Sequence, residues 1–226
     1  MVPQIVKSLS DILNQNSAIA WATEFNKGYR QIDILVAHLN DFFGNEDEVL
    51  PITRGLRQLK YTQIEVLSLI GVKGRVTPQY LAEKTWLPLD QIKRYVSDFL
   101  SLGLIEKVSK RSYAPTFWAK YMPKCIISIE AKLADWPTAL KQALYNKPAV
   151  DFSYVAFPLA VFSKRKAVLS EFQKYGIGVL GISQNGKSEI LVHPKHDPIH
   201  PVDHLITAIK VSKELSFSNK WRHFQK

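Results

Sequence analysis

The stretch Cys125–Trp136, CIISIEAKLADW, restricts the fold more than any other part of this chain. The isoleucines in its first half are typical of a buried strand, and Asp135 before Trp136 is typical of a helix start. Glu130 and Lys132 are two residues apart, so they lie on one face of an extended chain. Burying charged side chains is costly unless they are paired or bind something. The pair is therefore either a structural ion pair at a strand end or half of an active site.

The bulk composition predicts a globular protein of one large domain or two small ones. The chain has 226 residues, of which 46% are hydrophobic and 22% charged, as is usual for globular domains. One cysteine excludes an internal disulfide and a cysteine-rich zinc site. No apolar run approaches the roughly 20 residues that span a bilayer, and the first residues, MVPQIVKSLSDILNQNS, lack the apolar centre of a signal peptide. We expect a cytoplasmic protein, associated with the nucleoid when bound to DNA.

The charge of the chain points to an anionic partner. The formal net charge is +10, and an excess of this size favours nucleic acid, the alternative being a generally basic surface. The charge is also uneven, because NDFFGNEDEVL is acidic whereas KVSKRS and the C-terminal KWRHFQK are basic. Uneven charge favours a binding face.

Hydrophobic periodicity predicts alternating helices and strands on both sides of residues 51–118. The expected helices are 4–15, 136–145, 166–175 and 202–215. The expected strands are 18–25, 30–39, a strand that starts at Cys125 and includes Glu130 and Lys132, 150–158, 176–183 and 188–193. A turn at Gly28 joins the first two strands, Asn185–Gly186 turns into the last strand, and residues 40–51 form a linker.

Residues 51–118 have a different pattern, three helices followed by two short strands. Thr62 caps a first helix that ends at Gly71, Thr77 and Pro78 start a second, and Asp90 opens a third that ends at Gly103. The strands 104–108 and 113–116 are joined by a basic turn. This order resembles a winged helix-turn-helix module, the DNA-binding arrangement of many small bacterial regulators.

The resemblance implies which residues of this module face duplex DNA. The third helix of such modules lies in the major groove, and the wing contacts phosphates, which position without specifying sequence. The implied contacts are Gln91, Lys93, Arg94 and Ser97 on the helix and Lys107, Lys110 and Arg111 at the wing. Residues 55–118 carry ten Lys and Arg against five Asp and Glu, a net of +5. The alternative is a winged helix used only for protein contacts.

The segments on either side of the module, joined together, have the order αβββαβ, with Asp33 in RQIDILVA on the second strand and Glu130 with Lys132 in IEAK on the third. This arrangement resembles the restriction-endonuclease-like core of the PD-(D/E)xK nuclease superfamily. Gln142 and Tyr145 follow in a helix, spaced Q-x-x-Y rather than the Q-x-x-x-Y of some branches. Ile32 stands where the motif has its proline.

The resemblance covers roughly residues 4–40 and 120–185 and requires an insertion, because Asp33 and Glu130 are 97 positions apart. Insertions between strands are tolerated where the ends of the inserted module lie close together. The expected fold is an α/β restriction-endonuclease-like core with a mixed sheet, interrupted by the winged helix. The expected parts are residues 1–50, the first part of the core; 51–118, the insertion; and 119–226, the second part with the C-terminal helix.

The resemblance implies a metal-dependent DNA endonuclease. Asp33, Glu130 and the Ala131 carbonyl would hold Mg²⁺, with Mn²⁺ as a substitute, since Mg²⁺ prefers hard oxygen ligands. Lys132 would stabilise negative charge or orient the attacking water, and Gln142 would orient water or contact the phosphate backbone. Glu24 and Asp11 are further candidates to assist the metal. Double-strand cutting implies a homodimer or a partner protein. The alternative is a catalytically inactive DNA-binding regulator or targeting subunit.

A second group of polar residues lies in the connection HPKHDPIHP and just after it. It contains His193, His196, His200 and His204 with Asp197 and Asp203. Such residues bind Zn²⁺ or another transition metal when they converge. The prolines make this a stiff connection rather than one helix face, which favours a polar loop beside DNA.

Overall fold

The structure is a computed structural model, and it divides the chain into two compact units. It describes residues 5, 19–26, 31–38, 55–56, 58–116, 118, 122–123, 125–161, 166–196, 200–215 and 222–224. Apart from Ile5, the expected helix 4–15 lies outside the described residues, as do the linker 40–51, Gly28, Asp11 and Asp197. Unit 1 comprises residues 1–39, 124–200 and 219–226, and unit 2 comprises residues 40–123 and 201–218.

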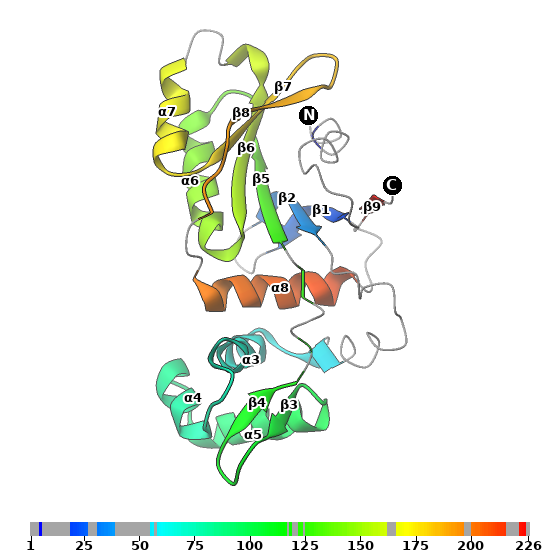
Figure 1. Cartoon of the computed structure of the whole chain (residues 1–226), viewed down its shortest axis with the longest axis vertical. Helices are drawn as coiled ribbons and strands as arrows, with labels where there is room; N and C mark the ends of the chain where they lie inside the picture. The colour runs from blue at the N-terminus through cyan, green and yellow to red at the C-terminus, as the bar shows by residue number, and fades with distance from the viewer. Residues whose placement is uncertain are drawn as a thin grey trace. The chain divides into compact units, whose positions relative to one another are not determined.

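Unit 1 contains a seven-stranded open sheet in the order β8-β7-β6-β5-β2-β1-β9 (Figure 1). The strands are β1 (Ile19–Asn26), β2 (Gln31–His38), β5 (Cys125–Ala131), β6 (Phe152–Pro158), β7 (Gly178–Ile182), β8 (Ser188–Val192) and β9 (Arg222–Phe224). The neighbours β5, β6 and β7 run parallel, and every other adjacent pair is antiparallel. The expected mixed α/β architecture is therefore confirmed, whereas β9 was not expected.

The two faces of this sheet bury different clusters. One face carries Trp21, Ile34, Ile129, Tyr154 and Leu180, with Ile5 packed among them. The other face packs against α6 (Trp136–Asn146) and α7 (Lys166–Lys174), which lie on the same side of the sheet (Figure 1). Side chains alternate between faces along a strand, so Glu130, next to Ile129, belongs to the face that α6 covers.

The start of α6 follows from its sequence. Asp135 accepts a hydrogen bond from the Thr138 backbone N–H at 3.2 Å, and Pro137 stands in the first turn, where its missing N–H is harmless. The expected cap at Asp135 is confirmed. It starts the helix five residues after Glu130, so α6 begins beside the end of β5.

The described part of unit 2 includes three consecutive helices, a two-stranded antiparallel hairpin and a further helix near the C-terminus. They are α3 (Tyr61–Lys73), α4 (Pro78–Thr85), α5 (Leu89–Ser101), β3 (Ile105–Lys107), β4 (Tyr113–Pro115) and α8 (Pro201–Leu215). The helices bury Leu67, Leu81, Ile92 and Phe99. Thr77 caps α4 by accepting from the Tyr80 N–H at 3.2 Å. The order of elements in residues 61–115 is the one the sequence predicts.

Both expected ends of the first helix in this unit are wrong. Thr62 does not cap α3: the helix begins at Tyr61, and Gln63 accepts from the Lys60 N–H at 2.9 Å. Gly71 does not end α3 either, because it is needed for close packing inside the helix. A Cβ at Gly71 would lie 2.6 Å from Leu205 and 3.0 Å from Trp118. The chain turns instead at Gly74, with φ of 71°.

The C-terminal helix α8 groups with unit 2, whereas the sequence-based division assigned it to the second part of the core. Its Ile209 and Val211 are buried. The Lys210 ammonium lies 4.8 Å from the centre of the Tyr61 ring, and the Ser212 hydroxyl donates to the Met122 sulfur at 3.7 Å. An apolar helix face predicts burial but does not say which surface buries it. No helix in the described ranges is long and apolar enough to cross a bilayer.

Candidate active site

The candidate site lies at the carboxyl end of β5, where the sheet changes from antiparallel to parallel pairing. β5 has antiparallel β2 on one side and parallel β6 on the other. In open α/β sheets, ligands bind outside the carboxyl ends of the strands. The pairing of Ile34 with Ile129, continued by one residue, puts Asp33 across from Glu130. Directly opposed residues share a face, so both carboxylates lie on the face that α6 covers.

Asp33 accepts two hydrogen bonds from the end of β5. Its Oδ2 lies 2.9 Å from the Ala131 backbone N and 3.5 Å from the Lys132 Nζ. Its side chain is 34% exposed. Asp33 is thus held by the neighbouring strand and still accessible to solvent, which a ligand of a substrate-bridging cation requires.

Glu130 is almost completely buried, with 1% of its surface exposed. Its two oxygens have different neighbours. Oε1 accepts from the Asn146 Nδ2 at 2.7 Å, and Oε2 lies 4.0 Å from the Lys132 Nζ. Because a buried carboxylate needs donors or a cation, this carboxylate is bound on the α6 side by an amide and on the β2 side by a charge.

Lys132 lies directly after β5 and is positioned by both backbone and charge. Its N–H donates to the Ala156 carbonyl at 3.0 Å, which continues the β5–β6 pairing. Its ammonium is within 4.0 Å of both Asp33 and Glu130. One cation against two carboxylates leaves a net charge of −1 when all three are ionised. The pair Glu130 and Lys132 therefore has a third member, which the sequence places 97 positions before Glu130.

The charge of Lys132 also reaches the start of α6. Hydrogen bonds from Thr138 hold the pKa of the Asp135 carboxyl below its ordinary value, and the Lys132 ammonium adds to this effect. Next to Lys132, the side chain of Leu133 is 73% exposed. The loop between β5 and α6 thus presents one cation and one apolar side chain to solvent.

The donor set fits a divalent cation with hard oxygen ligands. Two carboxylates converge on the Lys132 ammonium, which shows that a positive charge is stable where they meet. Among the residues that the structure describes, no three or more His, Cys, Asp or Glu side chains form a metal-binding group. These side chains alone would supply two ligands, and Mg²⁺ commonly takes one or two carboxylates and completes its octahedron with water and phosphate.

Glu24 lies on the far side of Asp33. The pairs Thr23 with Ile34 and Phe25 with Ile32 put Glu24 across from Asp33 in the β1–β2 register. Glu24 is exposed and has a left-handed backbone with φ of 56°. Bulky or charged residues rarely adopt this conformation, and irregular strand positions cluster near functional sites. The flanking pairs thus place the backbone of Glu24 beside that of Asp33.

The structure does not bring Gln142 into a described hydrogen bond with Asp33, Glu130 or Lys132. Gln142 is half-buried on α6, and its Oε1 is buried with no hydrogen-bond partner in the described part of the chain. The residue that reaches Glu130 is Asn146, one turn later. Sequence reasoning missed it, although its spacing of four from Gln142 puts both on one helix face.

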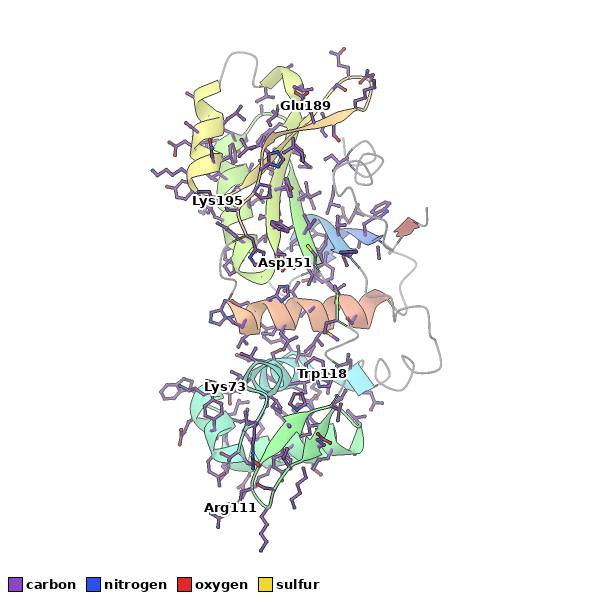
Figure 2. All side chains as sticks on the ribbon, viewed as in Figure 1. Lys73, Arg111, Trp118, Asp151, Glu189 and Lys195 are labelled. Carbon is purple, nitrogen blue, oxygen red and sulfur yellow. The ribbon has the colours of Figure 1, made fainter. Side chains whose placement is uncertain are left out.

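In the histidine segment, His196 pairs with the carboxylate of Asp151. His196 Nε2 lies 3.6 Å from Asp151 Oδ1, and its ring packs edge-on against Phe152 at 5.6 Å between centres. Asp151 also accepts from the Ile126 N–H at 2.6 Å; it lies just before β6, at the amino end of the strand (Figure 2). His193 and His200 are exposed. The described residues of this segment form no metal-binding group.

On unit 2, the four helix residues expected to face DNA differ from one another in their contacts. The Gln91 amide donates to the Tyr95 hydroxyl at 2.7 Å, and Lys93 pairs with Asp90 at 3.5 Å. Arg94 and Ser97 are exposed. The Tyr95 hydroxyl also lies 3.1 Å from Thr62; these hydrogen bonds, and the nearby positive charge of Lys60 and Arg94, lower the pKa of Tyr95, while burial opposes them.

The three cations of the β3–β4 hairpin are exposed. Lys107, Lys110 and Arg111 are exposed and form no ion pair with another described residue. Figure 2 shows Arg111 at the tip of the β3–β4 hairpin, pointing away from the helices of the unit. Cations in this state are available to phosphates.

Comparison with protein-family models, with curated proteins and with solved structures finds no match for this chain.

Proposed function

We propose that this protein is a metal-dependent DNA endonuclease whose inserted winged helix binds or orients duplex DNA. The single observation that supports it best is the convergence of Asp33, Glu130 and Lys132 at the carboxyl end of β5. The resemblance to the PD-(D/E)xK superfamily includes these same three residues. The exposed cations of the β3–β4 hairpin support DNA as the anionic partner.

In this proposal, Asp33, Glu130 and the Ala131 carbonyl hold the cation. When bound, a divalent cation polarises the phosphate and lowers the pKa of a bound water so that hydroxide forms near neutral pH. Lys132 stabilises the negative charge that develops on the phosphate, because its ammonium already lies within 4.0 Å of both carboxylates. Gln142 contacts the attacking water or the phosphate backbone.

A second candidate function is favoured by the same ion pairs. Lys132 partly neutralises Asp33 and Glu130 without any metal, and a self-contained charge set is what a non-catalytic, nuclease-like scaffold would retain. Such a protein would be a DNA-binding regulator or targeting subunit. Its affinity for DNA would not change with Mg²⁺ or with Asp33→Asn.

Cleavage and binding measured on the same preparations separate the two functions. Supercoiled, linear duplex and single-stranded DNA are incubated with Mg²⁺, Mn²⁺ or EDTA, and binding is measured with a labelled duplex. The nuclease proposal expects metal-dependent cleavage that Asp33→Asn, Glu130→Gln and Lys132→Ala each reduce by at least about a hundredfold. Lys187→Ala and Glu189→Gln are matched controls, because both residues are exposed in unit 1 near the β7–β8 turn. Metal-insensitive binding without cleavage of any DNA form would establish the second function instead.

A further inference from the structure

Asn146 is a buried polar residue that has no assigned role in the proposed reaction. It lies in the last turn of α6 and is 1% exposed. Its Nδ2 donates to Glu130 Oε1 at 2.7 Å, across sixteen positions of sequence. A hydrogen bond to a charged acceptor is shorter and stronger than one between neutral groups. Asn146 therefore holds one particular oxygen of the carboxylate.

The other end of this amide indicates that packing alone does not explain it. Asn146 Oδ1 is buried and accepts no hydrogen bond from the described residues. Leaving a buried acceptor unsatisfied costs free energy, and an apolar side chain of similar size avoids that cost. Such a side chain would, however, remove the donor to Glu130 Oε1. The contribution of Asn146 is thus tied to the carboxylate of Glu130.

The two oxygens of Glu130 have separate partners. Oε1 is bound by Asn146 of α6, and Oε2 is directed to Lys132, whose ammonium also contacts Asp33. The carboxylate plane of Glu130 can rotate about its terminal C–C bond, and the hydrogen bond from Asn146 restricts this rotation. With that bond in place, Oε2 faces the side of Asp33, where the proposed cation is held.

We propose that Asn146 is the positioning residue of the Glu130 carboxylate, binding Oε1 so that Oε2 is directed to Lys132 and to a divalent cation. The proposal deepens the nuclease function and rests on it for the identity of the cation. Groups that orient metal ligands typically change metal affinity or activity by about 10- to 100-fold when they are removed. Gln142, one turn earlier on α6, makes no hydrogen bond to Glu130 among the described residues.

The test uses Asn146→Leu and Asn146→Ala in the full chain. Lys141→Ala is the matched control, because Lys141 is exposed on the same helix. The Kd for Mn²⁺ is measured by calorimetry, cleavage is resolved into kcat and KM, and metal-free crystal structures are determined. We expect both Asn146 variants to raise the Kd for Mn²⁺ by about 10- to 100-fold and to lower kcat with KM for DNA unchanged. Lys141→Ala should leave all three measurements unchanged.

The crystal structures keep this proposal separable from the nuclease function. In Asn146→Leu, the Glu130 carboxylate should rotate so that Oε2 moves beyond 4.0 Å from the Lys132 Nζ. If the carboxylate does not rotate in Asn146→Leu, the positioning role alone is overturned. The same holds if the wild type cleaves DNA and the Asn146 variants bind Mn²⁺ with an unchanged Kd. If the wild type neither binds Mn²⁺ nor cleaves, the nuclease function and the cation's part of the proposal fail. Rotation would then still establish Asn146 as the residue that orients Glu130.

Discussion

The ammonium of Lys132 lies 3.5 Å from the carboxylate of Asp33, although 99 positions separate the two residues in the sequence. The contact joins β2 to the residue after β5 across the whole of residues 40–123, and it competes with any cation for the same oxygens. Lys132 therefore has two effects, one on the binding of metal and one on the phosphate. These effects have opposite signs.

Replacing Lys132 should separate metal binding from cleavage. Lys132→Met removes the ammonium that partly neutralises Asp33 and Glu130. We expect the Kd for Mn²⁺ to fall about tenfold, equivalent to ~1.4 kcal/mol, while cleavage is lost. Asp33→Asn should lose both Mn²⁺ binding and DNA cleavage. Calorimetry with cleavage on the same samples checks this, and weaker Mn²⁺ binding by Lys132→Met would show that the lysine does not compete with the metal.

The wing should contribute phosphate contacts that carry no sequence information. Lys110 and Arg111 are exposed and unpaired among the described residues. Changing both to alanine should weaken duplex binding equally for unrelated sequences. It should also reduce the slope of log K against log salt by roughly two, since each phosphate contact contributes about 0.9. Titrations at several salt concentrations measure this slope, with Lys187→Ala as the control. An unchanged slope would place the DNA contacts elsewhere.

The single cysteine should react very slowly. Burial, with a smaller effect of the Asp151 carboxylate, raises the pKa of the Cys125 thiol from 9.0 to about 12. The thiolate is the reactive form, so alkylation at pH 8 should be about a thousandfold slower than for a free thiol. Iodoacetamide labelling followed by mass spectrometry, before and after unfolding in urea, measures the ratio. Rapid labelling of the native protein would mean that this end of β5 opens readily.

The same shifts predict loss of stability at alkaline pH. Burial, together with Cys125, also raises the pKa of Tyr154, from 10.0 to about 12. The folded state therefore holds both protons more tightly than the unfolded state does. Their contribution to stability is fully present below about pH 9 and is lost as the pH rises to about 12. Urea unfolding between pH 8 and pH 11 measures the decline, which should be smaller in Cys125→Ala. An equal decline in that variant would assign the effect to other groups.

Two turns of unit 2 should respond oppositely to changes at a left-handed residue. Trp86 follows α4 with φ of 59° and is 92% exposed, so its ring gains little from burial. Trp86→Gly should raise the free energy of unfolding by about 1 kcal/mol. Gly74 has a φ of 71° and open space around a Cβ. Gly74→Ala should lower the free energy of unfolding by about 1 kcal/mol. Urea unfolding compares both with the wild type. A less stable Trp86→Gly would mean that the indole packs against unit 2 in solution.

The local sequence determined the elements of this protein. The isoleucines at 126, 127 and 129 predict β5, the caps at Thr77 and Asp135 predict the starts of α4 and α6, and Gly103 predicts the end of α5. These features depend on neighbours within a few positions, so they are readable from the chain alone. Asp33, Glu130 and Lys132 were also named from the sequence, through the resemblance to the PD-(D/E)xK motif.

Only the tertiary structure decided which of these residues meet. The register of β2 against β5 puts Asp33 across from Glu130, and the packing of α6 on the sheet selects Asn146, rather than Gln142, as the partner of Glu130. Packing likewise retains Gly71 inside α3 and groups α8 with unit 2. Register and face-to-face packing depend on the fit of surfaces far apart in sequence, and apolar patterns say that a face is buried without saying against what. Asp33 and the charged pair at the end of β5 were named from the sequence, whereas their contacts and the fourth member, Asn146, were decided by the fold.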